Sequence, residues 1–194
     1  MTQICLVRHG QTEWNLLGKL QGQTDIPLNE TGKRQAEECR EFLKKSEWDV
    51  LITTSLKRAR KTAEIINESL KLTIVEMDHF KERHFGEGEG LSREEREKRY
   101  PDFNFPYMES YEELVGRVQE GLEEIHAQFP AKKVLLVAHG AVINAVLREF
   151  HQEKGALEHV KLFNGCLTNL HFRSERWAVH SYNEVGHLSE HFKS

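Results

Sequence analysis

The pattern that most constrains the fold of this chain is the recurrence of short apolar runs, most of them followed by a stretch with helical periodicity. Four such runs are predicted to be strands, at residues 3–7, 50–53, 72–75 and 133–138. Helices are predicted to follow at about 30–45, 56–69 and 140–150. Val134–Ala138 is apolar throughout, as expected of a strand that is buried on both faces of a sheet. This alternation predicts an α/β fold, with a mainly parallel sheet covered by helices on both faces.

Local signals place further elements. Asn29 is a predicted N-cap, and Ser110 with Glu113 has the spacing of a capping box ahead of another helix. Ser92 and Glu95 have the same spacing ahead of a short charged helix. Two closing strands are predicted at residues 167–172 and 177–182.

The chain has 194 residues, which is the size of one domain, and we expect residues 1–194 to form a single domain. The segment at about 86–108 lies between predicted core elements and is rich in glycine, proline and aromatic residues. Insertions of this kind commonly cover active sites, so we expect it to act as a lid.

Composition excludes several classes of protein. Lys and Arg number 27 and Asp and Glu 31, and the resulting charge of −4 argues against a dedicated nucleic-acid binder. The longest clear apolar run has five residues, far fewer than the roughly 20 that a membrane span needs. Cys5, Cys39 and Cys166 form no CxxC pair, which argues against a disulfide framework and a structural zinc site. We expect a cytoplasmic protein in a reducing environment.

Residues suited to chemistry follow several of the predicted strands. The carboxyl ends of parallel strands lie along one edge of a sheet, and ligands bind there. The segments at these ends are Arg8-His9-Gly10, Ser55–Arg60, Glu82-Arg83-His84 and His139-Gly140. A neutral histidine can act as a nucleophile, and arginines bind phosphoryl oxygens through paired N–H donors. Each segment alone is also typical of a turn or a solvated loop, but together they indicate phosphoryl transfer.

The motifs then resemble a known family. Leu6-Val7-Arg8-His9-Gly10-Gln11-Thr12-Glu13-Trp14-Asn15 resembles the Arg-His-Gly signature of the histidine phosphatase superfamily, also called the phosphoglycerate-mutase-like family. Further resemblances to its motifs are Ser55–Ala59 around Arg58, Glu82 with Gly86 and Glu89-Gly90, and Ala138-His139-Gly140. The resemblance covers residues 4 to 140 in the family's order.

The resemblance implies a three-layer α/β/α sandwich with a mostly parallel sheet. It also implies that His9 is the nucleophile, that Arg8, Arg58 and a protonated His139 bind the phosphoryl group, and that Glu82 protonates the leaving oxygen. Asn15, Gln21, Gly22 and Gly140 would line the phosphate side of the pocket. The substrate would be a small phosphorylated metabolite, and neither a metal nor another cofactor is implied.

The mutases and phosphatases of this family share the same core, so their loop sequences must distinguish the two activities. Residues 91–110 lack the basic Trp-Arg-Arg segment of the cofactor-dependent phosphoglycerate mutases, and Phe103, Phe105 and Tyr107 suggest an apolar pocket mouth. The chain is most similar to the compact broad-specificity phosphatases, which hydrolyse phosphomonoesters. A phosphoglycerate mutase and a catalytically inactive binding module remain as alternatives, and the rings could instead only seal the lid onto the core.

Three details of the sequence lead to further expectations. Gly88 stands where many of those phosphatases have Trp, so a wall of the pocket is either missing or supplied from elsewhere. Glu87 and Glu89 alternate with glycines, and we expect substitutions there to cost little activity. His187 and His191 have the spacing of metal ligands on a helix, but without a third ligand nearby we interpret them as part of a surface tail.

Overall fold

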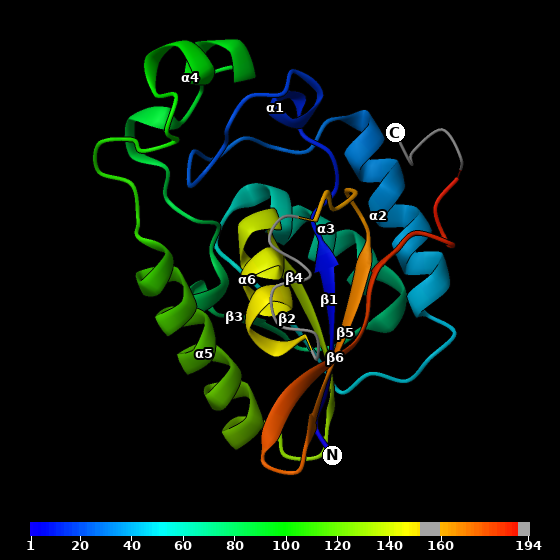
Figure 1. Cartoon of the computed structure of the whole chain (residues 1–194). Coiled ribbons are helices and arrows are strands. Elements are labelled where there is room, and N and C mark those ends of the chain that lie inside the picture. The colour runs from blue at the N-terminus through cyan, green and yellow to red at the C-terminus, as the bar shows by residue number, and fades with distance from the viewer. Residues whose placement is uncertain (152–159, 190–194) are drawn as a thin grey trace.

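The computed structural model describes residues 1–151 and 160–189 (Figure 1). Within these residues six strands form one sheet in the order β3-β2-β4-β1-β5-β6. The strands are β1 (Gln3–Arg8), β2 (Val50–Thr53), β3 (Ile74–Glu76), β4 (Lys133–Ala138), β5 (Leu167–Arg173) and β6 (Arg176–Glu184). Strands β3, β2, β4 and β1 are parallel, whereas β5 pairs antiparallel with β1, and β6 antiparallel with β5.

Helices cover both faces of the sheet, which confirms the predicted α/β/α sandwich. The α-helices are α1 (Glu13–Leu16), α2 (Glu30–Leu43), α3 (Lys57–Leu70), α4 (Arg93–Arg99), α5 (Tyr111–Gln128) and α6 (Gly140–Phe150). Two 3₁₀ turns, η1 (Asp78–Phe80) and η2 (Gly86–Gly88), lie between β3 and α4. Helices α2 and α3 pack on one face, and α5 and α6 on the other (Figure 1).

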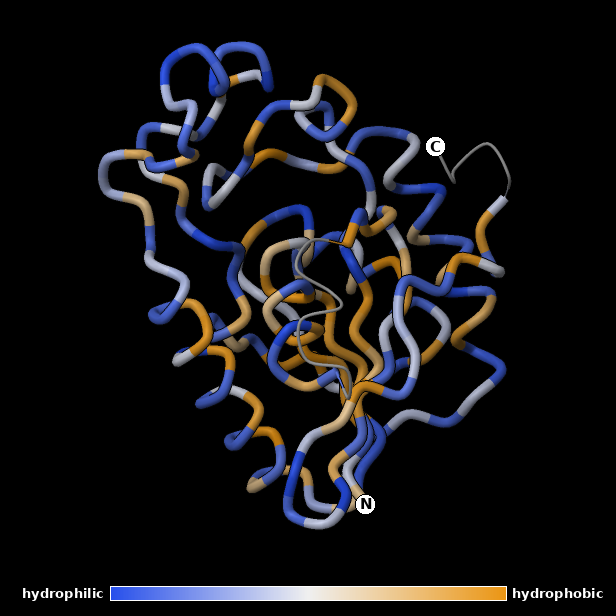
Figure 2. The backbone as a smooth tube through the Cα atoms, viewed as in Figure 1, coloured by the Kyte–Doolittle hydropathy of each residue, from blue (hydrophilic) through white to orange (hydrophobic). Residues whose placement is uncertain are grey.

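Two apolar clusters hold these layers together. Because side chains alternate across a strand, Ile4 and Leu6 of β1 pack with α5 and α6, while Cys5 and Val7 pack with α2 and α3. Figure 2 shows the result: hydrophobic residues are concentrated in the central strands and α6, and hydrophilic residues around α4. None of the helices in the described part of the chain is long and apolar enough to cross a membrane.

Most predicted boundaries agree with the structure. The side chains of Asn29, Ser92 and Ser110 cap α2, α4 and α5, as predicted. The strand predicted from residue 72 begins instead at Ile74, because the Asn67 side chain hydrogen-bonds the backbone of Leu72 at 2.8 and 2.9 Å and keeps it in the cap of α3.

The short helix α1 was not predicted. It begins after Thr12, whose hydroxyl accepts a hydrogen bond from the Asn15 N–H, while the Asn15 side chain accepts one from the Thr12 N–H. This capping box closes a single helical turn that has no buried residue, so hydrophobic periodicity could not reveal it. In Figure 1, α1 and α4 lie above the carboxyl end of β1.

Candidate active site

The candidate site is centred on two buried histidines at the ends of adjacent strands. His9 follows β1 and His139 follows β4, and the His9 N–H donates to the Ala138 carbonyl at 3.0 Å. Their ring centroids are 5.2 Å apart. The parallel pairing of β1 with β4 therefore brings together two residues that are far apart in sequence.

The environment of His9 fixes both its tautomer and its charge. Its Nδ1 lies 2.7 Å from the Gly10 carbonyl oxygen, which can only accept, so Nδ1 carries the hydrogen and Nε2 keeps its lone pair. Burial, together with the positive charges of Arg58 and Arg8, holds the pKa of His9 well below its ordinary value. His9 is therefore a neutral imidazole at neutral pH, as a nucleophile must be.

His139 differs from the expectation that it is protonated. Burial, followed by the nearby Arg58 charge, lowers the pKa of His139 well below its ordinary value. Its Nε2 lies 2.9 Å from the hydroxyl of Thr54, another fully buried residue. When that hydroxyl donates to Nε2, Nδ1 carries a hydrogen and is a neutral donor.

The two arginines are held by backbone carbonyls. Arg58 is fully buried in the first turn of α3 and donates to the carbonyls of Gly22 at 2.6 Å and Thr24 at 2.9 Å. Arg8 donates to the Leu162 carbonyl. These bonds use only the terminal nitrogens and fix the direction of each guanidinium.

Three polar side-chain atoms are buried without a hydrogen-bond partner among the residues that the structure describes. They are Arg8 Nε, Arg58 Nε and His139 Nδ1. Buried donors are nearly always paired in proteins, so three at one site are unusual. All belong to residues that the sequence assigns to phosphoryl binding, and an anion with several acceptor oxygens would satisfy them.

Glu82 lies next to this set. One of its carboxylate oxygens accepts from the Ala141 N–H at 3.0 Å and from the Arg83 N–H at 2.9 Å, which places it at the N-terminus of α6. A β-carbon on Gly140 would lie 3.6 Å from Arg8 Nε and 3.7 Å from Glu82 Oε2. Burial raises the pKa of Glu82, although the charge of Arg58 opposes this effect.

The predicted phosphate-side residues are joined by hydrogen bonds. The Thr12 hydroxyl donates to the Gln21 side-chain oxygen at 2.8 Å, and Asn164 donates to the His9 carbonyl at 3.0 Å and to the Asn15 side-chain oxygen at 3.3 Å. Sequence reasoning missed Asn164, because it follows no predicted strand and belongs to none of the quoted motifs.

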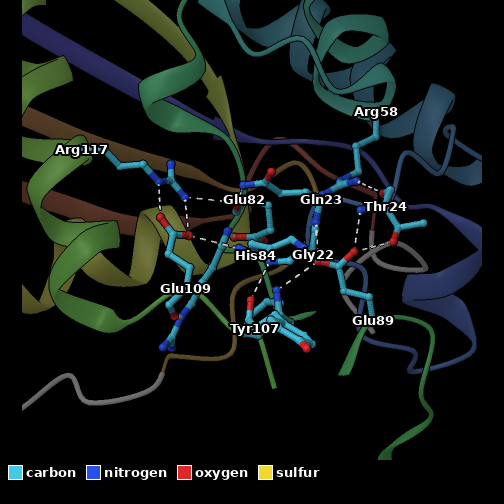
Figure 3. A network of polar contacts seen from close by, with 12 residues as sticks. Gly22, Gln23, Thr24, Arg58, Glu82, His84, Glu89, Tyr107, Glu109 and Arg117 are labelled. Atoms are coloured by element: carbon cyan, nitrogen blue, oxygen red, sulfur yellow. Dashed lines mark hydrogen bonds and ion pairs between the residues drawn. The ribbon is translucent and has the colours of Figure 1, made fainter. Parts of the chain in front are cut away.

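Glu89 is placed differently from the expectation of a flexible, solvated loop. One carboxylate oxygen accepts from the N–H groups of Gln23 and Phe85 at 3.0 Å, and the other from the N–H of Thr24 at 2.9 Å and from its hydroxyl (Figure 3). Gly22 makes room for this carboxylate, because a β-carbon there would lie 2.0 Å from Glu89 Oε1. Glu89 thus fixes the position of the segment at residues 22–24, whose carbonyls accept hydrogen bonds from Arg58.

The space beside Gly88 is filled by an aromatic ring. A β-carbon on Gly88 would lie 2.7 Å from the ring of Phe105, which is buried, whereas Phe103 and Tyr107 are exposed. The ring centroids of Phe103 and Phe105 are 4.8 Å apart. The ring of Phe105 therefore packs inward and fills the space that a larger side chain at position 88 would occupy. Phe103 and Tyr107 face the surface.

The two histidines of the tail are only partly covered by the structure. His187 is half-buried and contacts the Gly165 carbonyl oxygen at 3.0 Å and Cys39 Sγ at 3.4 Å. His191 lies outside the described residues. Across residues 1–151 and 160–189 there is no group of three or more His, Cys, Asp or Glu side chains that could hold a metal ion.

Comparison with known proteins adds independent information. The family described as histidine phosphatase superfamily (branch 1) matches residues 4–185. The "Uncharacterized phosphatase PhoE" of Bacillus subtilis is 53% identical, over 100% of both chains. A "Metal-independent phosphoserine phosphatase" of Arabidopsis thaliana is 34% identical, over 97% of this chain and 84% of its own. A phosphoserine phosphatase of Entamoeba histolytica, solved as a mutant in complex with phosphoserine, is 30% identical, with a TM-score of 0.80 over 97% of this chain and 100% of its own.

Proposed function

The chain belongs to the histidine phosphatase superfamily and is a phosphatase, and we propose that it hydrolyses small phosphomonoesters through a phosphohistidine formed on His9. The observation that carries this proposal is the set of three unpartnered buried atoms on Arg8, Arg58 and His139. A phosphoryl group has enough acceptor oxygens to bond all three. The neutral Nε2 of His9 lies beside His139 and is free to attack the phosphorus.

In the first step the lone pair of His9 Nε2 forms a bond to phosphorus, and the bond from phosphorus to the ester oxygen breaks. Arg8 and Arg58 stabilise the charge on the non-bridging oxygens, and the neutral His139 donates from Nδ1. Glu82 gives its proton to the leaving oxygen, so the product is a neutral alcohol. The raised pKa of Glu82 favours the protonated form that this step needs.

In the second step water attacks the phosphohistidine. The ionised Glu82 takes a proton from that water, the bond from phosphorus to nitrogen breaks, and inorganic phosphate leaves. Glu82 is then protonated again and His9 has regained its lone pair, so both groups return to their starting states. Two guanidinium groups already supply positive charge, and we propose that turnover needs no metal ion.

The ester itself is a narrower proposal. Two of the relatives are named for phosphoserine, so we propose phosphoserine as the first alkyl ester to test. We also propose that residues 86–108 act as a lid over this site and that residues 1–194 work as one cytoplasmic unit.

One assay tests the function. The protein is incubated with phosphoserine, 3-phosphoglycerate, a sugar bisphosphate and p-nitrophenyl phosphate, with and without excess EDTA. We expect phosphate release in both conditions and no conversion of 3- to 2-phosphoglycerate, with or without added bisphosphoglycerate. Isomerisation faster than phosphate release would identify a mutase, and activity that EDTA abolishes and magnesium or zinc restores would contradict the metal-free mechanism.

A further inference from the structure

A second arginine network lies behind Glu82 and is not part of the predicted site. Arg117, on α5, donates through Nη1 to the carbonyls of His79 and Lys81, both at 2.7 Å, and through Nη2 to the carbonyl of Glu82 at 3.2 Å. The same guanidinium forms a two-point ion pair with Glu109, with Nη2 2.9 Å from Oε2 (Figure 3). One side chain thus hydrogen-bonds three carbonyls of the segment at residues 79–82, which ends at Glu82.

Glu109 extends this hold to the other side of Glu82. Its Oε2 accepts from the His84 N–H at 3.1 Å, and its own N–H donates to the His84 carbonyl at 2.9 Å. Its carbonyl accepts from Arg83 Nε at 2.9 Å. The backbone is therefore held immediately before Glu82 by Arg117 on α5, and immediately after Glu82 by Glu109, which lies just ahead of that helix.

We propose that Arg117 and Glu109 are positioning residues for Glu82, a role that rests on the proposed function and extends it. A proton donor acts only within hydrogen-bond reach of the leaving oxygen. Glu82 lies on an irregular segment rather than on a strand or helix, so its position depends on side chains that hold the loop. The planar fork of an arginine can bond several carbonyls and a carboxylate at once, and a lysine cannot reproduce this geometry.

Leaving-group dependence separates this role from a merely structural one. An alkyl alkoxide needs the proton of Glu82, whereas nitrophenolate leaves readily without it. Displacing Glu82 should therefore slow an alkyl ester much more than p-nitrophenyl phosphate. A general loosening of the pocket would slow both esters to the same extent.

The experiment compares kcat/KM on phosphoserine, or on the fastest alkyl ester of the panel, with kcat/KM on p-nitrophenyl phosphate. This ratio reports only the steps up to departure of the leaving group, and not the hydrolysis of the phosphohistidine that both esters share. For Arg117→Lys we expect a loss of roughly 10- to 100-fold on the alkyl ester and about three-fold or less on p-nitrophenyl phosphate. Glu109→Gln keeps the shape of the side chain but weakens the ion pair, and it should show the same selectivity to a smaller degree. It also serves as the test if Arg117→Lys does not fold.

Arg40→Lys is the matched control. The Arg40 side chain is 23% exposed against 20% for Arg117, and it pairs with Glu68 away from Glu82. We expect its ratio of the two activities to equal that of the wild type. Equal losses on both esters, or an unchanged ratio in both Arg117→Lys and Glu109→Gln, would overturn the positioning role. A wild-type protein that hydrolyses no ester would instead overturn the proposed function itself.

Discussion

At the scale of single residues, the site combines a buried neutral histidine, the proposed nucleophile, with a buried carboxyl group, the proposed acid. The pKa of His9 is lowered and that of Glu82 is raised, and burial is the largest cause of both shifts. Burial always disfavours the charged form, so it acts in opposite directions on a base and on an acid. Burial thus favours the neutral form of both groups, which is the form that the proposed first step needs.

The proposed intermediate can be trapped on His9. Phosphohistidine is destroyed by acid, so turnover of a ³²P-labelled ester should be stopped with alkali. We expect label on the wild-type protein and none on His9→Ala, because His9 keeps a ring nitrogen with a lone pair, whereas Nε2 of His139 lies 2.9 Å from the Thr54 hydroxyl. Label that survives in His9→Ala would assign the nucleophile to a different residue.

The acid role of Glu82 predicts a pH dependence with a defined sign. Glu82 must be protonated, so kcat/KM on an alkyl ester should fall as pH rises through the raised pKa of this carboxyl. Glu82→Gln should remove that limb and lower kcat/KM on the alkyl ester by roughly 10²- to 10⁴-fold, with a much smaller loss of kcat/KM on p-nitrophenyl phosphate. Comparable losses on both esters would remove Glu82 from this role.

The site residues that follow strands could be predicted from the sequence, whereas those whose side chains hydrogen-bond the main chain of distant segments could not. His9 and His139 stand directly after apolar runs, so their place at one edge of the sheet followed from the fold class. Arg117 and Glu89 act through main-chain groups of distant segments. Main-chain groups are common to all residue types, so the sequence does not indicate which residue will be the hydrogen-bond partner.

At the scale of elements, the site depends on a junction between the segment at residues 20–24 and the segment at residues 85–91. The backbone joins them where the Gly90 N–H donates to the Leu20 carbonyl at 2.8 Å and the Leu20 N–H to the Leu91 carbonyl at 3.1 Å. Glu89 adds the carboxylate described above. The position of Arg58 therefore depends on a loop that does not contain it.

Glu89→Gln tests this junction. A glutamine turns an NH₂ group toward N–H donors, so at least one of the bonds to Gln23, Thr24 or Phe85 must be lost. We expect a loss of roughly 10-fold or more that is equal on alkyl and nitrophenyl esters, since phosphoryl binding by Arg58 serves both. Inhibition by inorganic phosphate or vanadate should weaken in parallel.

Glu87→Gln provides the control within the same loop. The Glu87 side chain accepts from the hydroxyl of Tyr100 at 3.0 Å in an exposed contact, and we expect its substitution to change neither activity. Equal behaviour of the Glu87 and Glu89 variants would contradict the junction and restore the simpler expectation that both are loop residues of little consequence.

The helices and strands themselves were largely predictable, and the packing of the insertion was not. Capping boxes at Ser92 and Ser110 mark helix starts locally, within four residues. The contact of Phe105 with Gly88 joins an irregular segment to the 3₁₀ turn η2. No periodicity relates them, so the sequence alone could say only that a wall was missing or came from elsewhere.

At the scale of the whole molecule, the buried histidines make stability depend on pH. The folded pKa values of His9 and His139 lie below those of the unfolded chain, so their contribution is present above about pH 6.5 and is lost as pH falls. Glu82 has the opposite sign, since its raised pKa gives a contribution that is lost as pH rises. Two histidines oppose one carboxyl, so acid should destabilise the protein.

Urea unfolding at pH 7.5 and 5.5 measures this effect. We expect a lower midpoint at pH 5.5, with each histidine contributing at most about 1.4 kcal/mol per pH unit. The double variant His9→Asn with His139→Asn should show a smaller decrease, and Glu82→Gln a larger one. A double variant with the same decrease as the wild type would assign the acid sensitivity to other groups.

The pairing of β1 also has a consequence for how the enzyme is made. The strand that leads to His9 precedes both of its neighbours in the sheet, β4 and β5, along the chain. Until residues 133–138 and 167–173 have been synthesised, β1 has no partner and the proposed nucleophile has no His139 beside it. Domains fold largely as units, so a growing chain should hydrolyse no phosphate ester until both of these segments have been synthesised.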